Sequence, residues 1–109
     1  MIKKLGAGLL TVGIFIAAAG PAIADGDAAA GSKKIQMCQG CHGIDGFRTA
    51  YPEVYSVPKL GGQNANYIVA ALKEYKSGDR QHPSMRGIAA SLSEQDMADL
   101  AAYYSSAPK

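Results

Sequence analysis

Residues 37–43 read MCQGCHG, and this short segment constrains the fold more than any other part of the chain. Cys38 and Cys41 lie three positions apart, about one turn of a helix, and His42 directly follows the second thiol. Thiols and an imidazole at this spacing can form a disulfide, hold a metal ion, exchange electrons or anchor a larger group. Which of these applies depends first on the cellular compartment, because stable disulfides and exported cofactor proteins belong outside the cytoplasm.

The N-terminal residues 1–24 have the pattern of an export signal. Two lysines give a basic start, residues 5–19 form an apolar stretch, and residues 22–24 provide an A-x-A cleavage site. The apolar stretch is shorter than the roughly 20 residues that a membrane-spanning helix needs, so an uncleaved anchor is the less favoured alternative. We expect cleavage after Ala24, a mature chain that starts at Asp25, and a periplasmic location.

Removal of this leader changes the net charge of the chain. The leader contains Lys3 and Lys4 and no acidic residue, so the 11 basic residues fall to nine and equal the nine acidic ones. Net charge therefore drops from +2 to zero, which argues against a nucleic-acid partner. The remaining residues 25–109 form one domain, whose small core should need a disulfide, metal or cofactor as additional support.

Three segments have the periodicity and end signals of helices, which predicts an all-α fold. The first covers residues 27–38 and contains no proline. The second has Asn64 as N-cap and stops at Gly78, and the third begins with a capping box of Ser93 and Asp96. The apolar stripes of the last two, which we expect to pack mostly in the core, are Tyr67, Ile68, Ala71, Leu72 and Tyr75, and Met97, Leu100, Ala101 and Tyr104.

Residues 43–62 have no periodicity and are interrupted by glycines and prolines, which predicts an extended loop. An unstructured loop of about 20 residues is unusual in a compact small domain. A large flat apolar ligand would account for it, because the loop would wrap the ligand and bury apolar side chains against it. The side chains expected to do so are Phe47, Tyr51, Tyr55, Val57 and Leu60.

Four interpretations of the cysteine pair have unequal support. A zinc site needs about four ligands, and the two thiols and His42 have only His82 to join them. A thioredoxin-like dithiol requires a preceding strand, which the sequence lacks, and a disulfide across so short a loop would constrain little. In an exported chain, C-x-x-C-H is the attachment sequence for c-type haem, in which both thiols bond to the porphyrin and the imidazole coordinates the iron. We favour this last interpretation.

An iron that only carries electrons needs a sixth ligand, since an open site would bind oxygen or peroxide. Met37 is adjacent to the first thiol and cannot reach the opposite haem face, and Met97 lies on a stripe expected in the core. His82 and Met85 lie in GDRQHPSMRGIA, which we expect to be a proline-containing loop, and either could ligate. Met85 is favoured because Pro83 restricts the backbone at His82. His82 is then expected to be a surface histidine whose loss changes little.

Motifs along the chain resemble those of the small bacterial class I c-type cytochromes. They are CHG at 41–43, PKLGGQ at 58–63, ALKEYKSGDR at 71–80, HPSM at 82–85 and ASLSEQDMADLAAYY at 90–104. The chain is also similar to one half of the two-haem members of this group. The resemblance covers nearly all of residues 25–109 and implies three to five short helices wrapped around one covalently bound haem.

The resemblance also implies contacts and roles for individual residues. The N-terminal helix should cross the last helix near Leu100 and Tyr103, with Gly31 at the crossing because a missing side chain permits close approach. The implied site residues are Cys38 and Cys41 for the two thioethers, His42 and Met85 as axial iron ligands, and Pro58, whose carbonyl would meet the His42 ring.

These inferences together predict a periplasmic monohaem c-type cytochrome that carries single electrons and is not an enzyme. Redox partner proteins should dock briefly at an exposed haem edge through a small interface, and the protein should be a monomer or weak dimer without a membrane span. Two alternatives remain. A haem enzyme with an open sixth site would have a high-spin spectrum, and a cytochrome subunit of a dehydrogenase complex would copurify with a larger flavin or quinone protein.

Overall fold

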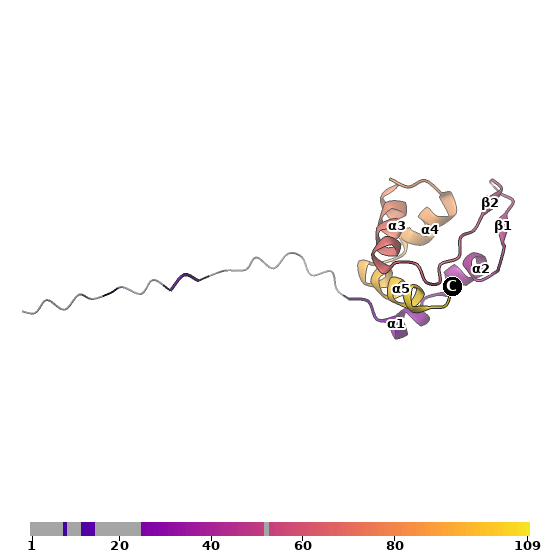
Figure 1. The fold of residues 1–109 in the computed structure, drawn as a ribbon. Coiled ribbons are helices and arrows are strands. Elements are labelled where there is room, and N and C mark those ends of the chain that lie inside the picture. The colour runs from indigo at the N-terminus through magenta and orange to yellow at the C-terminus, as the bar shows by residue number, and fades with distance from the viewer. Residues whose placement is uncertain (1–7, 9–11, 15–24, 52) are drawn as a thin grey trace, which may run out of the picture.

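The computed structural model describes residues 8, 12–14, 25–51 and 53–109, and its regular structure is almost entirely helical (Figure 1). The predicted cleavage site and most of the predicted export signal lie outside these residues. Among the described residues, no helix has the length and apolarity required to cross a bilayer. The elements in chain order are α1 (Ala28–Ser32), α2 (Gln36–His42), β1 (Arg48–Thr49), β2 (Tyr55–Ser56), α3 (Ala65–Ser77), α4 (Pro83–Ala90) and α5 (Glu94–Ser106).

Helix α5 is the centre of the packing. Helices α1 and α3 both pack against it, and α4 packs against α3 (Figure 1). Met97 and Leu100 of α5 are only 1% and 2% exposed, so the expectation that Met97 belongs to the core is confirmed. The expected all-α fold is confirmed as well. The buried cluster at the centre consists of Ile35, Ile68, Leu72, Leu92, Met97, Leu100 and Ala101.

The ends of α3 and α5 follow the predicted local signals. The Asn64 side chain accepts a hydrogen bond of 3.0 Å from the backbone N–H of Tyr67, and α3 ends at Gly78, whose φ of 88° is the left-handed conformation that glycine tolerates. At the start of α5, the Ser93 hydroxyl accepts from the Asp96 N–H and the Asp96 carboxylate accepts from the Ser93 N–H. This is the predicted capping box, and it satisfies two backbone donors at once.

The prediction of one helix over residues 27–38 is wrong, because two helices meet there at a turn. Helix α1 ends at Ser32, the Lys34 N–H donates to the Gly31 carbonyl at 2.9 Å, and α2 begins at Gln36. The turn allows Ile35 to enter the core, where it is 8% exposed. Burial of Ile35 thus outweighs the local preference for a continuous helix.

The segment around Pro83 was expected to be a loop, and it is instead the start of helix α4. Pro83 occupies the first turn of this helix, where its missing N–H costs nothing and its fixed φ favours helix formation. His82 is the N-cap and is half-buried, so the description of it as a surface loop histidine is also wrong.

Most of residues 43–62 is irregular, as predicted, but a small antiparallel hairpin interrupts the segment. Arg48 pairs with Ser56 and Thr49 pairs with Tyr55. The hairpin lies beside α2, on the side of the molecule away from α1 (Figure 1). It is too short to leave a recognisable alternation in the sequence.

The predicted crossing between the N-terminal and last helices is present, and Gly31 lies at the contact. A Cβ atom added at Gly31 would collide with the Asp99 carbonyl and come within 2.9 Å of the Tyr103 Cβ. Gly26 makes a similar approach just before α1, where an added Cβ would collide with the Ala98 carbonyl. Any side chain at either glycine would therefore push the N-terminal segment away from α5.

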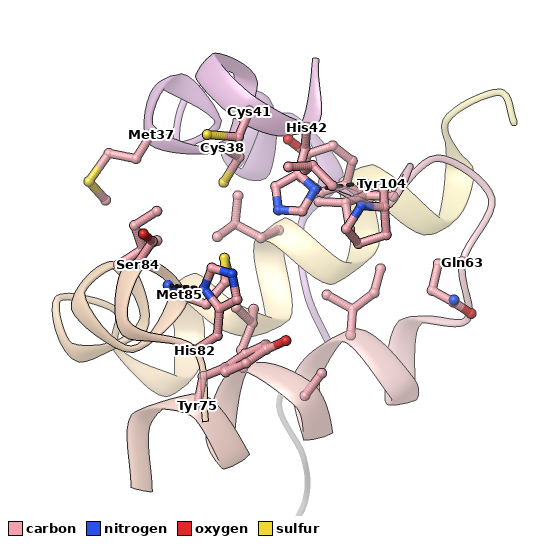
Figure 2. Close-up of a pocket in the computed structure, with 18 of the residues that line it drawn as sticks. Met37, Cys38, Cys41, His42, Gln63, Tyr75, His82, Ser84, Met85 and Tyr104 are labelled. Atoms are coloured by element: carbon pink, nitrogen blue, oxygen red, sulfur yellow. Dashed lines mark hydrogen bonds between the residues drawn. The ribbon is translucent and has the colours of Figure 1, made fainter. Parts of the chain in front are cut away.

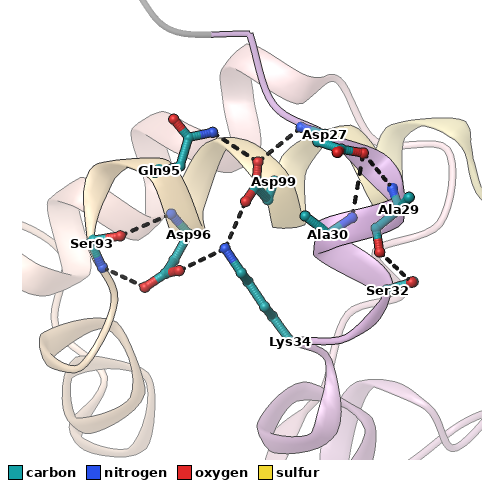
Figure 3. A network of polar contacts seen from close by, with 9 residues as sticks. All are labelled: Asp27, Ala29, Ala30, Ser32, Lys34, Ser93, Gln95, Asp96 and Asp99. Carbon is teal, nitrogen blue, oxygen red and sulfur yellow. Dashed lines mark hydrogen bonds and ion pairs between the residues drawn. The ribbon is translucent and has the colours of Figure 1, made fainter.

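A polar network around Asp99 fastens the N-terminal segment to α5 (Figure 3). Asp99 is 2% exposed, and its carboxylate accepts from the Asp27 N–H at 2.8 Å, the Lys34 ammonium at 2.6 Å and the Gln95 amide at 2.8 Å. Lys34 also forms an ion pair of 2.8 Å with Asp96. The buried charge is therefore fully paired, which is the condition under which a buried carboxylate is tolerated.

These contacts lower the pKa of both carboxyl groups. The Asp27 backbone donor, followed by Lys34, lowers the pKa of Asp99 to about 2, and the Lys34 hydrogen bond lowers the pKa of Asp96 to about 2. A carboxyl group whose pKa is lower in the folded state stabilises the fold above its ordinary value of 3.8. That stabilisation is lost as the pH falls from about 4 towards 2.

We predict that Asp99→Asn lowers the melting temperature of the haem-loaded protein by at least about 5 °C at pH 7. The neutral amide cannot balance Lys34, and it brings N–H donors to a site built for acceptors. Because Asn does not titrate, the difference in unfolding free energy between wild type and variant should shrink as the pH falls from 4 towards 2. Denaturant titrations followed by far-UV circular dichroism measure this difference.

The matched control is Asp45→Asn, because Asp45 is 93% exposed and its ion pair with Lys59 spans 3.3 Å at the surface. This change should leave the melting temperature nearly unaltered. A loss of stability in Asp99→Asn that stays constant between pH 7 and pH 2 would contradict the assigned role of the charge.

Candidate functional site

A cavity of about 330 Å³ lies between α2, the segment after β1, α3 and α4. Side chains of α2 lie on one side of it and side chains of α4 on the facing side (Figure 2). Its apolar lining comes from segments far apart in the sequence, and comprises Val57, Leu60, Ile68, Ala71, Leu72, Ile88, Leu92 and Leu100.

Helix α2 brings the C-x-x-C-H residues to this cavity. Cys38, Cys41 and His42 all line it, and both cysteines are free thiols. Burial raises the pKa of the Cys38 thiol, and the neighbouring Tyr104 hydroxyl offsets part of that rise. Since the two thiols lie one helical turn apart on a seven-residue helix, they face the same space as the imidazole.

The His42 ring is held by a backbone carbonyl of the irregular segment that follows β2. His42 Nδ1 lies 2.7 Å from the Pro58 carbonyl oxygen. A carbonyl only accepts, so the ring proton is on Nδ1, and Nε2 keeps a free lone pair. This arrangement is the one found in metal-binding histidines, where a fixed partner at one nitrogen orients the other.

Across the cavity, the first turn of α4 presents Met85 and His82 (Figure 2). Met85 is half-buried and packs against the core cluster. The His82 ring accepts a hydrogen bond through Nδ1 from the Met85 N–H, at 3.3 Å. The fold thus gathers both thiols, His42 and Met85 around one cavity, although the last lies more than 40 residues from the first three.

The loop side chains expected to bury a ligand divide into two groups. Tyr55, Val57 and Leu60 line the cavity, whereas Tyr51 and Phe47 do not. Tyr51 is 88% exposed, so its predicted burial is wrong. The hairpin explains the difference, because Tyr51 lies in the connection between its two strands.

The apolar stripe of α3 was expected to pack mostly in the core, but much of it borders the cavity instead. Only Ile68 and Leu72 are buried in the core, while Tyr67 is 49% exposed. All five residues of the stripe line the cavity, including Ala71 and Tyr75. Periodicity identified the correct face of the helix, but it could not distinguish a face that packs against protein from one that borders a cavity.

Arg80 also lines the cavity, a position that the sequence does not predict. Its guanidinium donates to the Tyr67 hydroxyl at 3.0 Å, and this bond is the main cause of the raised pKa of Arg80. The same group lies 5.7 Å from the centre of the Tyr67 ring and 5.2 Å from that of Tyr75. The chain reverses at Gly78 and so returns Arg80 over α3. No local pattern in the sequence predicts the path of the chain after Gly78.

The donor set fits a covalently attached haem. Two thiols in a C-x-x-C-H arrangement adjoin an imidazole with a free Nε2, and a thioether lies across an apolar cavity. The zinc alternative lacks its fourth ligand, since no group of three or more His, Cys, Asp or Glu side chains able to hold a metal occurs in the described part of the chain.

Comparisons with known proteins agree with this donor set. The cytochrome c family profile matches residues 28–108. Cytochrome c4 of Pseudomonas aeruginosa is 42% identical over 97% of this chain and 49% of its own length, so the chain spans about half of that protein. Cytochrome c-554(548) of Halomonas halodenitrificans is 46% identical over 74% of this chain and 96% of its own length.

A solved structure has the same fold. The reduced recombinant cytochrome c4 from Pseudomonas stutzeri superposes with a TM-score of 0.61 and 38% identity, covering 76% of this chain and 46% of that one. At this level of sequence identity, the two chains share a related sequence as well as a topology. The profile match over nearly all of the helical domain, together with the near full-length relative, shows that this chain belongs to the cytochrome c family, whose members hold haem c covalently.

Proposed function

We propose that this chain is a periplasmic monohaem cytochrome that carries single electrons between redox proteins. The observation that carries the proposal is the arrangement of α2 and α4 on facing sides of one cavity, with Cys38, Cys41 and His42 opposite Met85. When bound, haem c supplies a one-electron ferrous/ferric couple. Everything else in the function depends on how this chain holds that group and limits access to it.

The residues of α2 have two tasks in this proposal. The thiols of Cys38 and Cys41 would add to the two porphyrin vinyl groups, and the resulting thioether bonds would prevent loss of the haem from a small exported domain. His42 would coordinate through Nε2, while the Pro58 carbonyl holds the proton on Nδ1 and orients the ring. A hydrogen bond at the second nitrogen also makes the imidazole a stronger donor towards a metal.

On the facing side, the Met85 thioether would hold the iron as its sixth ligand. Its soft sulfur would favour the ferrous state more than an imidazole does, which would raise the reduction potential. Ile88 and Leu92 border the cavity beside it and would limit the access of water to a bound haem. A filled sixth position would oppose the binding of oxygen or peroxide, as an electron carrier requires and a haem enzyme does not.

Transient docking at the edge of the haem site completes the proposal. Met37 and Ile44 lie just before and just after the C-x-x-C-H residues, and each is 51% exposed. Exposed apolar side chains beside a cofactor suit a small, short-lived interface with redox partners. We propose that the protein works as a monomer or weak dimer, free of the membrane after removal of residues 1–24.

Intact mass spectrometry of the protein, produced with a haem-attachment system, tests the proposal. We predict a single species that starts at Asp25 and carries one haem, bonded through Cys38 and Cys41. Extraction of the haem by acidified acetone would contradict covalent attachment. A mass that includes residues 1–24 would contradict release into the periplasm while leaving the attachment unaffected.

A further inference from the structure

His82 occupies the junction between α4 and two other cavity elements. As N-cap of α4 it has an extended backbone, with φ of −159° and ψ of 110°, and its Nδ1 accepts from the Met85 N–H. The N-terminal N–H groups of a helix have no partners within the helix, so this bond supplies what Met85 would otherwise lack. Because an N–H only donates, the ring proton of His82 is on Nε2.

The same ring is packed between two tyrosines from other elements. The Tyr55 ring, from β2, has its centre 5.1 Å from that of His82, with an interplanar angle of 67°. The Tyr75 ring, from α3, lies at 6.5 Å and 77°. Both are edge contacts, a favourable geometry for aromatic pairs. One side chain therefore links the hairpin, α3 and the backbone of Met85.

We propose that His82 is a positioning residue, which holds the first turn of α4 so that the Met85 side chain stays directed into the haem cavity. The inference rests on the proposed iron ligation by Met85. His82 acts through its cap and its packing and does not itself coordinate. The Met85 side chain can stay in one place only if its backbone is fixed. The His82 ring fixes that backbone through the hydrogen bond from the Met85 N–H.

This role differs from the one that the sequence alone suggests, in which loss of His82 is silent. Without the cap, the first turn of α4 should fray and the thioether should leave the iron more often. A small external ligand reports that event, because it binds ferric iron only when Met85 has left. Cyanide is the suitable probe, since it is too small to replace the missing imidazole ring in the cavity.

The test compares cyanide affinity of the ferric holoprotein in wild type, His82→Ala and His82→Asn. His82→Ala removes the cap and should raise the affinity by about 5- to 30-fold. Asn is among the best N-cap residues but lacks the ring that packs against the two tyrosines, so His82→Asn should reverse most, though not all, of this gain in affinity. Gln81→Ala, at the exposed neighbouring position, is the control and should have no effect. If His82→Ala does not accumulate, His82→Leu provides the same loss of an acceptor with a side chain of similar size.

Three results would count against the inference, and they separate its failure from that of the ligand assignment. Unchanged cyanide affinity in His82→Ala, with the sulfur-to-iron charge-transfer band intact, would overturn positioning by His82 while supporting Met85 as ligand. Equal gains in affinity for His82→Ala and His82→Asn would overturn the cap as its cause. Loss of the low-spin spectrum in His82→Ala, combined with a wild-type spectrum that lacks the charge-transfer band, would overturn Met85 ligation itself.

Discussion

Removal of both thiols, in Cys38→Ala with Cys41→Ala, is expected to leave a chain that does not fold cooperatively. Among the described residues the buried cluster has seven members, and one of its sides borders the cavity instead of other protein atoms. In the described part of residues 43–62, the regular structure is limited to one pairing of two-residue strands. Without a haem held in the cavity, the lining would face water and the core would be too small to offset chain entropy.

Far-UV circular dichroism and thermal melting of this double variant measure the effect. We expect a large loss of helical signal and no sigmoidal melt. Gln39→Ala is the matched control, since it changes one of the two residues between the thiols and keeps both thiols. Near-native helix content with a cooperative transition in the haem-free double variant would show that the fold does not depend on the cofactor.

Met85→Ala is expected to lower the reduction potential by on the order of 100 mV, a part of the roughly 0.8 V range that axial ligands span. The oxidised variant should lose the weak near-infrared sulfur-to-iron band and should bind small ligands such as cyanide. Potentiometric titration and near-infrared absorption measure both changes. The physical reason is the loss of a soft thioether that favours ferrous iron.

Met37→Leu is the control for this prediction. Met37 lines the same cavity but belongs to α2, on the side of the thiols, and it is 51% exposed. Its replacement should preserve both the band and the potential. The ligand assignment would fail if Met85→Ala kept both properties while His82→Ala abolished the low-spin spectrum, because the iron would then have two imidazole ligands.

Features that depend on neighbouring residues were predictable from the sequence. The Asn64 cap, the Gly78 stop and the capping box at Ser93 each involve residues at most three positions apart, or one backbone conformation. The C-x-x-C-H segment is equally local, because one helical turn fixes its geometry. Such signals keep their meaning whatever the remainder of the chain does.

Features decided by distant contacts were not predictable. The break between α1 and α2 follows from burial of Ile35 and from the reach of Lys34 to Asp99, which is 65 residues away. From the sequence, Pro83 predicts a loop, whereas in the structure it lies in the first turn of α4. The same proline is compatible with both structures, and packing of the following residues against α3 selects the helix.

The candidate site likewise combines features that are local in the sequence with features that depend on distant contacts. Its thiols and His42 are evident from their order in the sequence, whereas the surroundings of Met85 and His82 become known only with the fold. Both side chains line the cavity, and only the structure reveals that the His82 ring is engaged by the Met85 N–H and two tyrosines. The position of Arg80 depends on the direction that the chain takes after Gly78, and no sequence motif predicts that direction.

A redox titration of the purified holoprotein, monitored by its absorption spectrum, tests whether the protein carries single electrons on one low-spin haem. One covalently held haem that carries single electrons should give one reversible transition with a slope of about 59 mV per tenfold change in the ratio of oxidised to reduced protein. The spectrum should stay low-spin in both states, and the reduced protein should not bind carbon monoxide. A high-spin spectrum together with carbon monoxide binding would instead indicate an open sixth site and would contradict the role of an electron carrier.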